Sequence, residues 1–409
     1  MKFSAVADID RRGFFYLCGF ALVSCLSMAA SNVFLGLVIA AALHRCLRQR
    51  PTFHGLLDLV GRPVAVSFLV FAAWTIVSLI GAMDLAAGVR RVVNHYVFWP
   101  AEFFSVLLFV RSRQQVGRLA VFLVLSIVLN DVFVIGQCVW YGGWVRRFGG
   151  GIFYMAYATA LLMVLPLLVM YLLCGRDRRL WMAAAVAFAL SLVGLILNGT
   201  RTVWMLVLPF CIAAAYPCVR DKRRYVVGAI LAVAAVGALF AAVPSIGQRA
   251  QTIVQMESQQ SYQERTRIWT SAVHMAQDHP LTGVGFGSFK KAYQERYILP
   301  EAKERDLAHA HSNVMQMLGE CGVPGALAFV VFWLVFSAQA LWRYHRTGAI
   351  VHLVLFFTLN AIMLHGLTEF TWDRSITMKT FWMIFGLACV WMARDRVLAG
   401  TPEDEIHGL

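Results

Sequence analysis

Long runs of apolar residues limit what this chain can fold into more than any other feature of its sequence. About 20 consecutive apolar residues cross a bilayer as a helix, and twelve apolar runs alternate with breaks rich in charge, proline or glycine. Hydrophobic residues make up 60% of the 409 and charged residues 14%, which excludes a soluble enzyme, a disordered chain and a secreted disulfide scaffold. The continuous runs also disfavour a transmembrane barrel, whose strands alternate over about ten residues.

The sequence therefore predicts an all-α polytopic integral membrane protein with about 12 transmembrane helices and one long, partly helical outer loop. We expect helices near 14–30, 31–46, 63–82, 94–110, 116–140, 152–174, 180–198, 202–219, 225–243, 324–342, 350–366 and 378–393. The first two would be joined by a tight turn at Ser31 and Asn32. The chain then divides into nine helices in 1–243, the long loop 244–323, and three helices with a short tail in 324–409.

The basic residues predict the orientation. Of 36 Lys and Arg, 21 fall in seven short segments that lie on one side of the twelve-helix topology, so the positive-inside rule places both termini in the cytoplasm. The other 15 lie outside, eight of them in the long loop, where topology does not require them. The net charge of +14 is therefore no nucleic-acid signal. An N-terminal signal peptide is less favoured, because a second apolar segment follows at once.

The long loop contains one clearly amphipathic helix. Residues 261–277, SYQERTRIWTSAVHMAQ, place Ile268, Ala272 and Met275 on one stripe, and we expect this helix to lie along the membrane surface. The following segment 281–289, LTGVGFGSF, has three alternating glycines. Their spacing matches no phosphate-binding loop, so we interpret them as a tight backbone path.

A second loop helix is expected to begin near Asp306 and to run through 309–322 into Pro324. It would deliver His309 and His311 close to the outer surface. Two positions separate them by about 200° on a helix, so they would not form a same-face metal pair. One histidine could face a cavity, and the alternative is a structural or interfacial role.

Three outer arginines stand in unusual positions. Arg201, in NGTRT, interrupts two apolar segments, where an ionised side chain is costly without a partner. The alternative is that it extends to the lipid headgroups. Arg265 and Arg267 lie on the predicted surface helix and could form a solvated basic face. Near a pyrophosphate they would instead be ligands, because a guanidinium donates paired hydrogen bonds to phosphate oxygens.

These motifs, taken in order, resemble the O-antigen ligase family, whose superfamily includes O-antigen polymerases and protein O-oligosaccharyltransferases. The resemblance runs from about residue 140 onward. It rests on TRT at 200–202, on RTRIW at 265–269 with PLTGVG at 280–285, and on HSNVMQMLGECG at 311–322. Ser312 replaces the usual asparagine of the last motif, which moves to Asn313, and the usual Asn-Pro after the R-x-x-G-like element at Arg147 is absent.

The resemblance implies transfer of a glycan from undecaprenyl pyrophosphate to a sugar hydroxyl of lipid A–core, at the periplasmic face of a bacterial inner membrane. His311 would be the general base. Arg201 and Arg265 would stabilise the leaving pyrophosphate. Weaker candidates for the donor site are Arg267, Arg147, Arg90 and Arg91, and possible auxiliary residues are His309, Asn313 and Glu320. No metal or other cofactor is expected, direct attack would invert the anomeric centre, and membrane lipids are the remaining partners.

Other functions remain open. O-antigen polymerases often carry R-x10-G elements, but the residues eleven positions after Arg147, Arg249, Arg265 and Arg267 are Ala158, Gln260, Ala276 and Asp278. A transporter for a lipid-linked glycan would need charged groups near the bilayer centre and related halves, and neither is evident from the sequence. A glycosidase would need two facing carboxylates. The group His365, Glu369, Asp373 and Arg374 could border the acceptor site, although an ion-paired helix end is the favoured interpretation.

Overall fold

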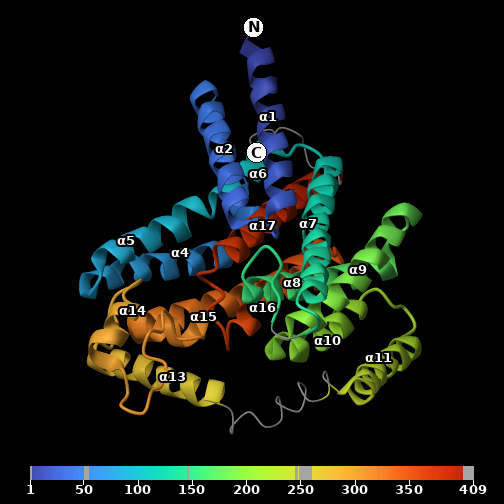
Figure 1. Cartoon of the computed structure of the whole chain (residues 1–409). Coiled ribbons are helices and arrows are strands. Elements are labelled where there is room, and N and C mark those ends of the chain that lie inside the picture. The colour runs from blue at the N-terminus through green and yellow to red at the C-terminus, as the bar shows by residue number, and fades with distance from the viewer. Residues whose placement is uncertain (1, 50–54, 145–146, 245–246, 248–259, 399–409) are drawn as a thin grey trace.

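The computed structural model describes the chain except for residues 1, 50–54, 145–146, 245–246, 248–259 and 399–409. Regular structure in the described ranges is helical, with no strand among them, which confirms the predicted all-α class. In Figure 1, α1 (Lys2–Val23) and α2 (Met28–Arg48) project together from one end of the molecule. At the opposite end, α13 (Gln260–Asp278) packs against α15 (Asn313–Thr347).

The N-terminal half continues with α3 (Leu56–Val60), α4 (Arg62–Val77), the short η1 (Ser78–Gly81), α5 (Leu85–Val93), the π-helical turn η2 (Asn94–Phe98), α6 (Ala101–Phe109), α7 (Arg113–Trp140), α8 (Tyr154–Cys174), α9 (Arg178–Asn198), α10 (Arg201–Ala215) and α11 (Lys222–Ala242). Polar residues that directly precede helices define several of these starts. Ser112 accepts a hydrogen bond from the Gln115 N–H at the start of α7, and Asp177 and Asp221 cap α9 and α11 in the same way.

The C-terminal half adds α14 (Phe289–Ala292), the π-helical turn η3 (Tyr293–Tyr297), α16 (Val351–His365) and α17 (Ser375–Leu398). Parts of the predicted long loop, residues 245–246 and 248–259, lie outside the described residues. The remainder of that loop packs as one unit on α15. Its helix α13 confirms the predicted amphipathic segment, because Ile268, Ala272 and Met275 are all fully buried.

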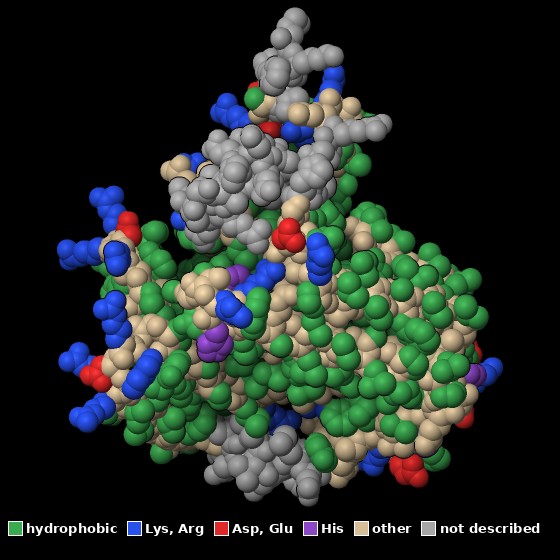
Figure 2. Space-filling model, turned by 180° about the vertical axis from the view of Figure 1, so that it is seen from behind, with side chains coloured by type: hydrophobic (Ala, Val, Ile, Leu, Met, Phe, Trp, Pro, Cys, Tyr) green, Lys and Arg blue, Asp and Glu red, His purple; other side chains and the backbone are tan. Residues whose placement is uncertain are grey.

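Nine helical stretches in the described part of the chain are long and apolar enough to cross a bilayer, while α10 and α16 are apolar helices of 15 residues. Each of the twelve predicted segments overlaps a helix, but twelve crossings stay a prediction. Apolar side chains such as Leu69 and Ile230 are each 62% exposed, and Figure 2 shows hydrophobic side chains over most of one face. A surface of this kind is favourable in lipid, so the chain is a multi-pass membrane protein.

The turn between the first two helices is not at Ser31 and Asn32, as predicted, but at residues 24–27. Ser27 begins α2 instead, because its hydroxyl accepts a hydrogen bond from the Ala30 N–H at 3.2 Å. Ser31 and Asn32 lie inside α2, where their side-chain oxygens accept hydrogen bonds from Lys379 Nζ at 3.2 and 2.7 Å. The predicted turn residues therefore join α2 to α17.

The predicted helix from Asp306 is also wrong. Residues 306–312 are not helical, and α15 begins at Asn313 because Ser312 is extended and its hydroxyl accepts from the Met315 N–H. From there α15 runs to Thr347 with a kink at Gly322, whose φ is 69°. The boundary predicted at residue 323 thus falls at a kink inside one helix.

The glycine-rich segment 281–289 follows a tight backbone path, as expected from its spacing. Gly283, Gly285 and Gly287 have φ values of 59°, 93° and 88°, which side chains with a Cβ rarely adopt. The segment is held on both sides, because the Val284 N–H donates to the Gly319 carbonyl at 2.9 Å and the Val284 carbonyl accepts from the Met83 N–H at 3.1 Å. It therefore joins α15 to the turn before α5.

Several charged side chains are buried in the apolar helices. Glu102 and Lys379 are both fully buried. Asp131 is fully buried in α7 and accepts hydrogen bonds from the hydroxyls of Tyr157 and Ser191. Asp131 joins α7 to α8 and α9, and Lys379 joins α17 to α2.

We predict that Gly322→Ala destabilises the fold. A Cβ at this position would lie 2.5 Å from the Pro280 carbonyl oxygen and 2.6 Å from that of Leu281, and the positive φ adds strain. We expect a loss of about 2 kcal/mol or more, measured as a lower thermal unfolding midpoint of the purified protein in detergent. Gly36→Ala is the control, because its Cβ would meet nothing within 4 Å. Equal midpoints for the two variants would contradict this account of the kink.

Candidate functional site

The site is built around an unusual backbone conformation at His311. Its φ is 49°, the only positive value at a non-glycine residue in the described ranges. Such a conformation costs about 1–3 kcal/mol and persists where surrounding contacts impose it. It lies directly before Ser312, which begins α15. His311 is therefore fixed at the start of a helix and is not part of one.

Four side chains meet at this point, and we call them the His311 cluster: His309, His311, Glu369 and Arg374. His311 Nδ1 lies 3.2 Å from Glu369 Oε2. The other oxygen, Oε1, accepts from Arg374 Nη2 at 2.8 Å, and the same Nη2 lies 3.2 Å from His309 Nε2. The Glu369 side chain is 2% exposed, whereas that of His311 is 28% exposed. With Nδ1 directed at Glu369, the His311 ring presents Nε2 on its opposite edge.

The surroundings set the charge states in the His311 cluster. Burial opposes ionisation of Glu369, but the hydrogen bonds from His311 and Arg374 outweigh it and hold the Glu369 pKa well below its usual range. Burial, reinforced by the neighbouring His311, lowers the pKa of His309 to about 3. At neutral pH, Glu369 is therefore a carboxylate and His309 is uncharged.

The two histidines do not lie on opposite sides of a helix, as predicted. Their ring centroids are 4.3 Å apart, because residues 306–312 are not helical. The ligand atoms of His309, His311 and Glu369 lie within 4.8 Å of one another, a spacing that could hold a metal ion. Arg374, however, already contacts both His309 and Glu369, so a divalent ion there would lie beside a fixed positive charge. This donor set fits a metal poorly.

Further arginines surround the His311 cluster. Arg265 on α13 lies close enough to Glu369 and Arg147 to interact with both electrostatically. Burial lowers the pKa of Arg265. The positive charge of Arg147 lowers it further, and the negative charge of Glu369 raises it. The guanidiniums of Arg147 and Arg374 lie over the rings of Tyr154 and Phe153, at 4.7 and 4.6 Å from their centroids. Each of the two neighbouring aromatic residues at the start of α8 thus contacts one arginine.

Arg201 lies where α10 begins, and its Nη2 donates to Ser261 Oγ on α13 at 3.1 Å. Arg265 follows one helical turn after Ser261, so Arg201 and Arg265 lie at the same end of α13. Thr202 next to Arg201 is hydrogen-bonded to Thr368, 2.8 Å between the hydroxyl oxygens. These contacts connect α10 to the segment that carries Glu369.

Two of the arginines predicted for the donor site, Arg267 and Arg90, make no described contact with the His311 cluster. Arg267 pairs with Glu264, whose second oxygen accepts from the N–H groups of Lys303 and Glu304, both at 3.1 Å. It therefore fastens the 303–304 segment to α13. Arg90 is exposed on α5, and the described contacts do not connect it to the His311 cluster.

Arg91 is the centre of a second group, the Arg91 network, formed with Glu320 and Asp373. Arg91 Nη1 donates to both Glu320 oxygens at 2.8 Å, and its Nη2 lies 3.2 Å from Asp373 Oδ2. The Glu320 side chain has no exposed surface, and its Oε1 also accepts from the Phe289 N–H at 3.1 Å. Arg91 is thus engaged by carboxylates, and the network joins α5 and α15 to the residue next to Arg374.

Asn313 holds the segment 366–372 against the start of α15. Its backbone N–H donates to the Gly366 carbonyl at 2.6 Å and its side-chain Nδ2 to Thr371 Oγ1 at 2.9 Å. The side-chain oxygen accepts from the Trp372 N–H at 3.1 Å. The displaced asparagine therefore makes three bonds that fix the position of Glu369.

Glu369 and Arg374 were considered only as a possible border of the acceptor site, with an ion-paired helix end favoured. The ion pair favoured for their segment is present, but the carboxylate also binds His311. The sequence feature that could have indicated them is the group of two acidic residues and an arginine in 369–374, directly after an apolar run. That signal does not show which histidine they face.

Comparison with curated proteins found no match. Comparison with protein families matched residues 186–330 to the family described as O-antigen ligase. The matched segment, about a third of the chain, contains Arg201, Arg265 and His311 and ends before Glu369. It agrees with the resemblance seen in the motifs, so residues 186–330 are similar to the O-antigen ligase family.

Proposed function

We propose that this protein is an O-antigen ligase. It would transfer a glycan from undecaprenyl pyrophosphate to a sugar hydroxyl of lipid A–core, at the periplasmic face of the inner membrane with both termini in the cytoplasm. The observation that carries the proposal is the His311–Glu369 pair, a partly exposed imidazole bound to a buried carboxylate and surrounded by arginines. The family match supports the wider class of lipid-linked glycan transferases.

A sugar hydroxyl needs a base because it is a weak nucleophile at neutral pH. Glu369 accepts from the Nδ1–H of His311, which leaves the Nε2 lone pair for the acceptor hydroxyl proton. As that proton moves to Nε2, the imidazole becomes positive, and the Glu369 carboxylate stabilises the charge. Glu369 is suited to this role because it stays ionised despite burial.

The bond from the anomeric carbon to the pyrophosphate oxygen breaks as the hydroxyl oxygen attacks, and the bonding electrons leave with the pyrophosphate. Positive groups fixed before the reaction stabilise this developing charge without reorganisation. Arg265, Arg201 and Arg147 supply such groups. Ser261 accepts a hydrogen bond from Arg201, and the ring of Tyr154 lies under Arg147. Direct attack of this kind inverts the anomeric centre and requires no metal.

Substitution of His311 tests the base. We expect His311→Ala to lower the transfer rate by about 10²–10⁴-fold, measured with lipid-linked glycan and lipid A–core in proteoliposomes. Glu369→Gln should lower the rate by a smaller factor, because an amide still orients the imidazole but does not stabilise the positive charge that it gains as it takes the proton. Exposed His274 on α13 provides the control, His274→Ala. Full activity of folded His311→Ala would exclude this base.

Substitution of Arg265 tests the donor site. We expect Arg265→Ala to lower kcat/KM for the lipid-linked donor by about 10²–10³-fold, with partial recovery in Arg265→Lys because the positive charge returns without the paired donors. Arg176→Ala, at an exposed position between α8 and α9, should leave the value within about twofold. Similar losses for Arg265→Ala and Arg176→Ala would contradict a specific pyrophosphate contact.

A further inference from the structure

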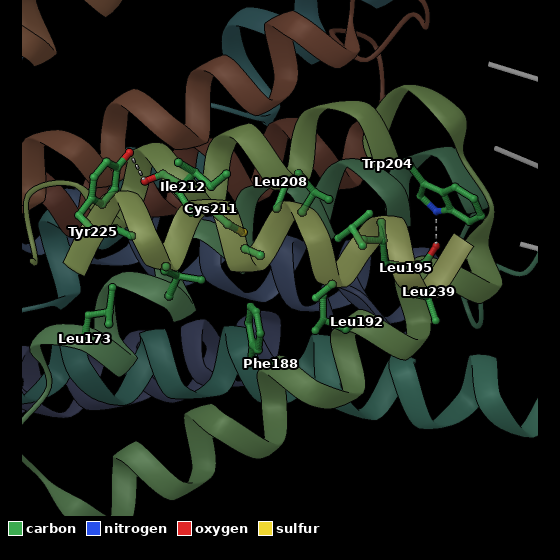
Figure 3. A pocket seen from close by; sticks show the side chains of 18 of the residues that line it. Leu173, Phe188, Leu192, Leu195, Trp204, Leu208, Cys211, Ile212, Tyr225 and Leu239 are labelled. Atoms are coloured by element: carbon green, nitrogen blue, oxygen red, sulfur yellow. Dashed lines mark hydrogen bonds between the residues drawn. The ribbon is translucent and has the colours of Figure 1, made fainter. Parts of the chain in front are cut away.

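A long apolar cavity lies among α8, α9, α10 and α11, away from the His311 cluster. Its volume is about 660 Å³, and Arg224 is the one charged residue among those that line it. Figure 3 shows Trp204 and Tyr225 at opposite ends, with Leu208 and Phe188 between them. Both end residues are fixed, because Trp204 Nε1 donates to the Leu195 carbonyl at 2.9 Å and Tyr225 Oη to that of Ile212 at 3.3 Å.

One stripe of α10 connects the cavity to Arg201. Trp204, Leu208, Cys211 and Ala215 line the cavity and recur at intervals of three and four residues, which places them on one face of the helix. Arg201 stands three residues before Trp204 and is therefore the next member of this stripe. The cavity thus leads along α10 toward the arginine that contacts α13.

The opposite wall is formed by α11, which has no buried residue. Its cavity-lining residues extend from Arg224 to Phe240, about 24 Å at 1.5 Å per residue, which is most of the thickness of a bilayer core. Phe240 stacks on Trp204 with 6.0 Å between ring centroids. The C-terminal end of α11 therefore lies beside Arg201, and its N-terminal end lies at the far end of the cavity.

We infer that this cavity holds the polyisoprenoid chain of the lipid pyrophosphate donor. The inference rests on the proposed function and adds to it a location for the lipid. A chain lying between Trp204 and Tyr225 places its charged end at Arg201, at the start of α10, where backbone N–H groups and the helix dipole also favour an anion. The apolar lining matches the hydrocarbon, and Arg201, beyond the Trp204 end, matches the pyrophosphate, while Arg224 lies at the other end beside Tyr225.

The chemistry of the reaction selects the donor over the acceptor as the occupant. In the donor, the reacting carbon is bonded to the pyrophosphate, and the isoprenoid chain begins on its other side. The chain must therefore start within one pyrophosphate of the reacting centre. The acceptor reacts at a sugar of its core, separated from its acyl chains by the intervening sugars, so its chains need not enter a cavity beside Arg201.

Two glycines of α11 allow a matched test. A Cβ at either Gly228 or Gly237 would meet nothing within 4 Å, so a larger side chain creates no clash. Gly228 lines the cavity and Gly237 does not. Gly228 is twelve residues from Phe240, about 18 Å, so Gly228→Phe would block the far part of the cavity and leave the part near Arg201 open.

The experiment measures binding of undecaprenyl pyrophosphate and of the shorter farnesyl pyrophosphate to the full chain in detergent by native mass spectrometry. Gly228→Phe should weaken undecaprenyl pyrophosphate binding by about tenfold and leave farnesyl pyrophosphate binding unchanged. Gly237→Phe should change neither by more than about twofold.

Equal affinities of the two variants for undecaprenyl pyrophosphate would overturn the inference. So would equally effective displacement by phosphatidylglycerol, which would show an ordinary lipid site. Binding is measured without transfer, so a protein that shows the expected binding pattern but no transfer to lipid A–core would contradict the proposed ligase function alone. Normal transfer with no effect of Gly228→Phe on binding would contradict the cavity alone.

Discussion

The buried carboxylate of Glu369 is the group on which the candidate site depends. An ionised carboxylate in a low-dielectric environment is unfavourable unless it is paired and hydrogen-bonded. Here one oxygen faces His311 and the other Arg374, so both are occupied. The same contacts orient the imidazole, hold a guanidinium beside it, and compensate the backbone strain at His311.

The position of Glu369 depends in turn on two groups of contacts with distant parts of the chain. Asn313 fixes the loop that carries it, and the Arg91 network fixes Asp373 next to Arg374. Breaking one partner of a buried ion pair leaves an uncompensated charge, which costs about 3–5 kcal/mol. Arg91 is therefore held by carboxylates, whereas Arg265 is the arginine that we propose for the donor. In the same proposal, the lipid chain of the donor would lie in the cavity along α10 and its pyrophosphate beside Arg201.

The sequence predicted the all-helical class, the apolar segments and the amphipathic stripe of α13, because apolar periodicity reports burial directly. It could not place the start of α15, since the left-handed conformation of His311 arises from contacts with residues about 58 positions away. The partners of individual side chains could not be predicted for a similar reason. Arg91, a weaker candidate for the donor site, contacts Glu320, and the helix end that carries Glu369 was considered as an ion pair or a border of the acceptor site without its contact to His311. Such pairings depend on loop geometry that periodicity does not encode.

The central claim is that the His311 cluster transfers a glycan from a lipid carrier to a second lipid-linked sugar. It is tested most directly by adding the purified protein to vesicles that contain undecaprenyl-pyrophosphate-linked glycan and lipid A–core, and by sizing the products. We expect glycan attached to lipid A–core, with release of undecaprenyl pyrophosphate. Longer glycans that remain on the carrier would instead identify a polymerase and contradict the ligase function.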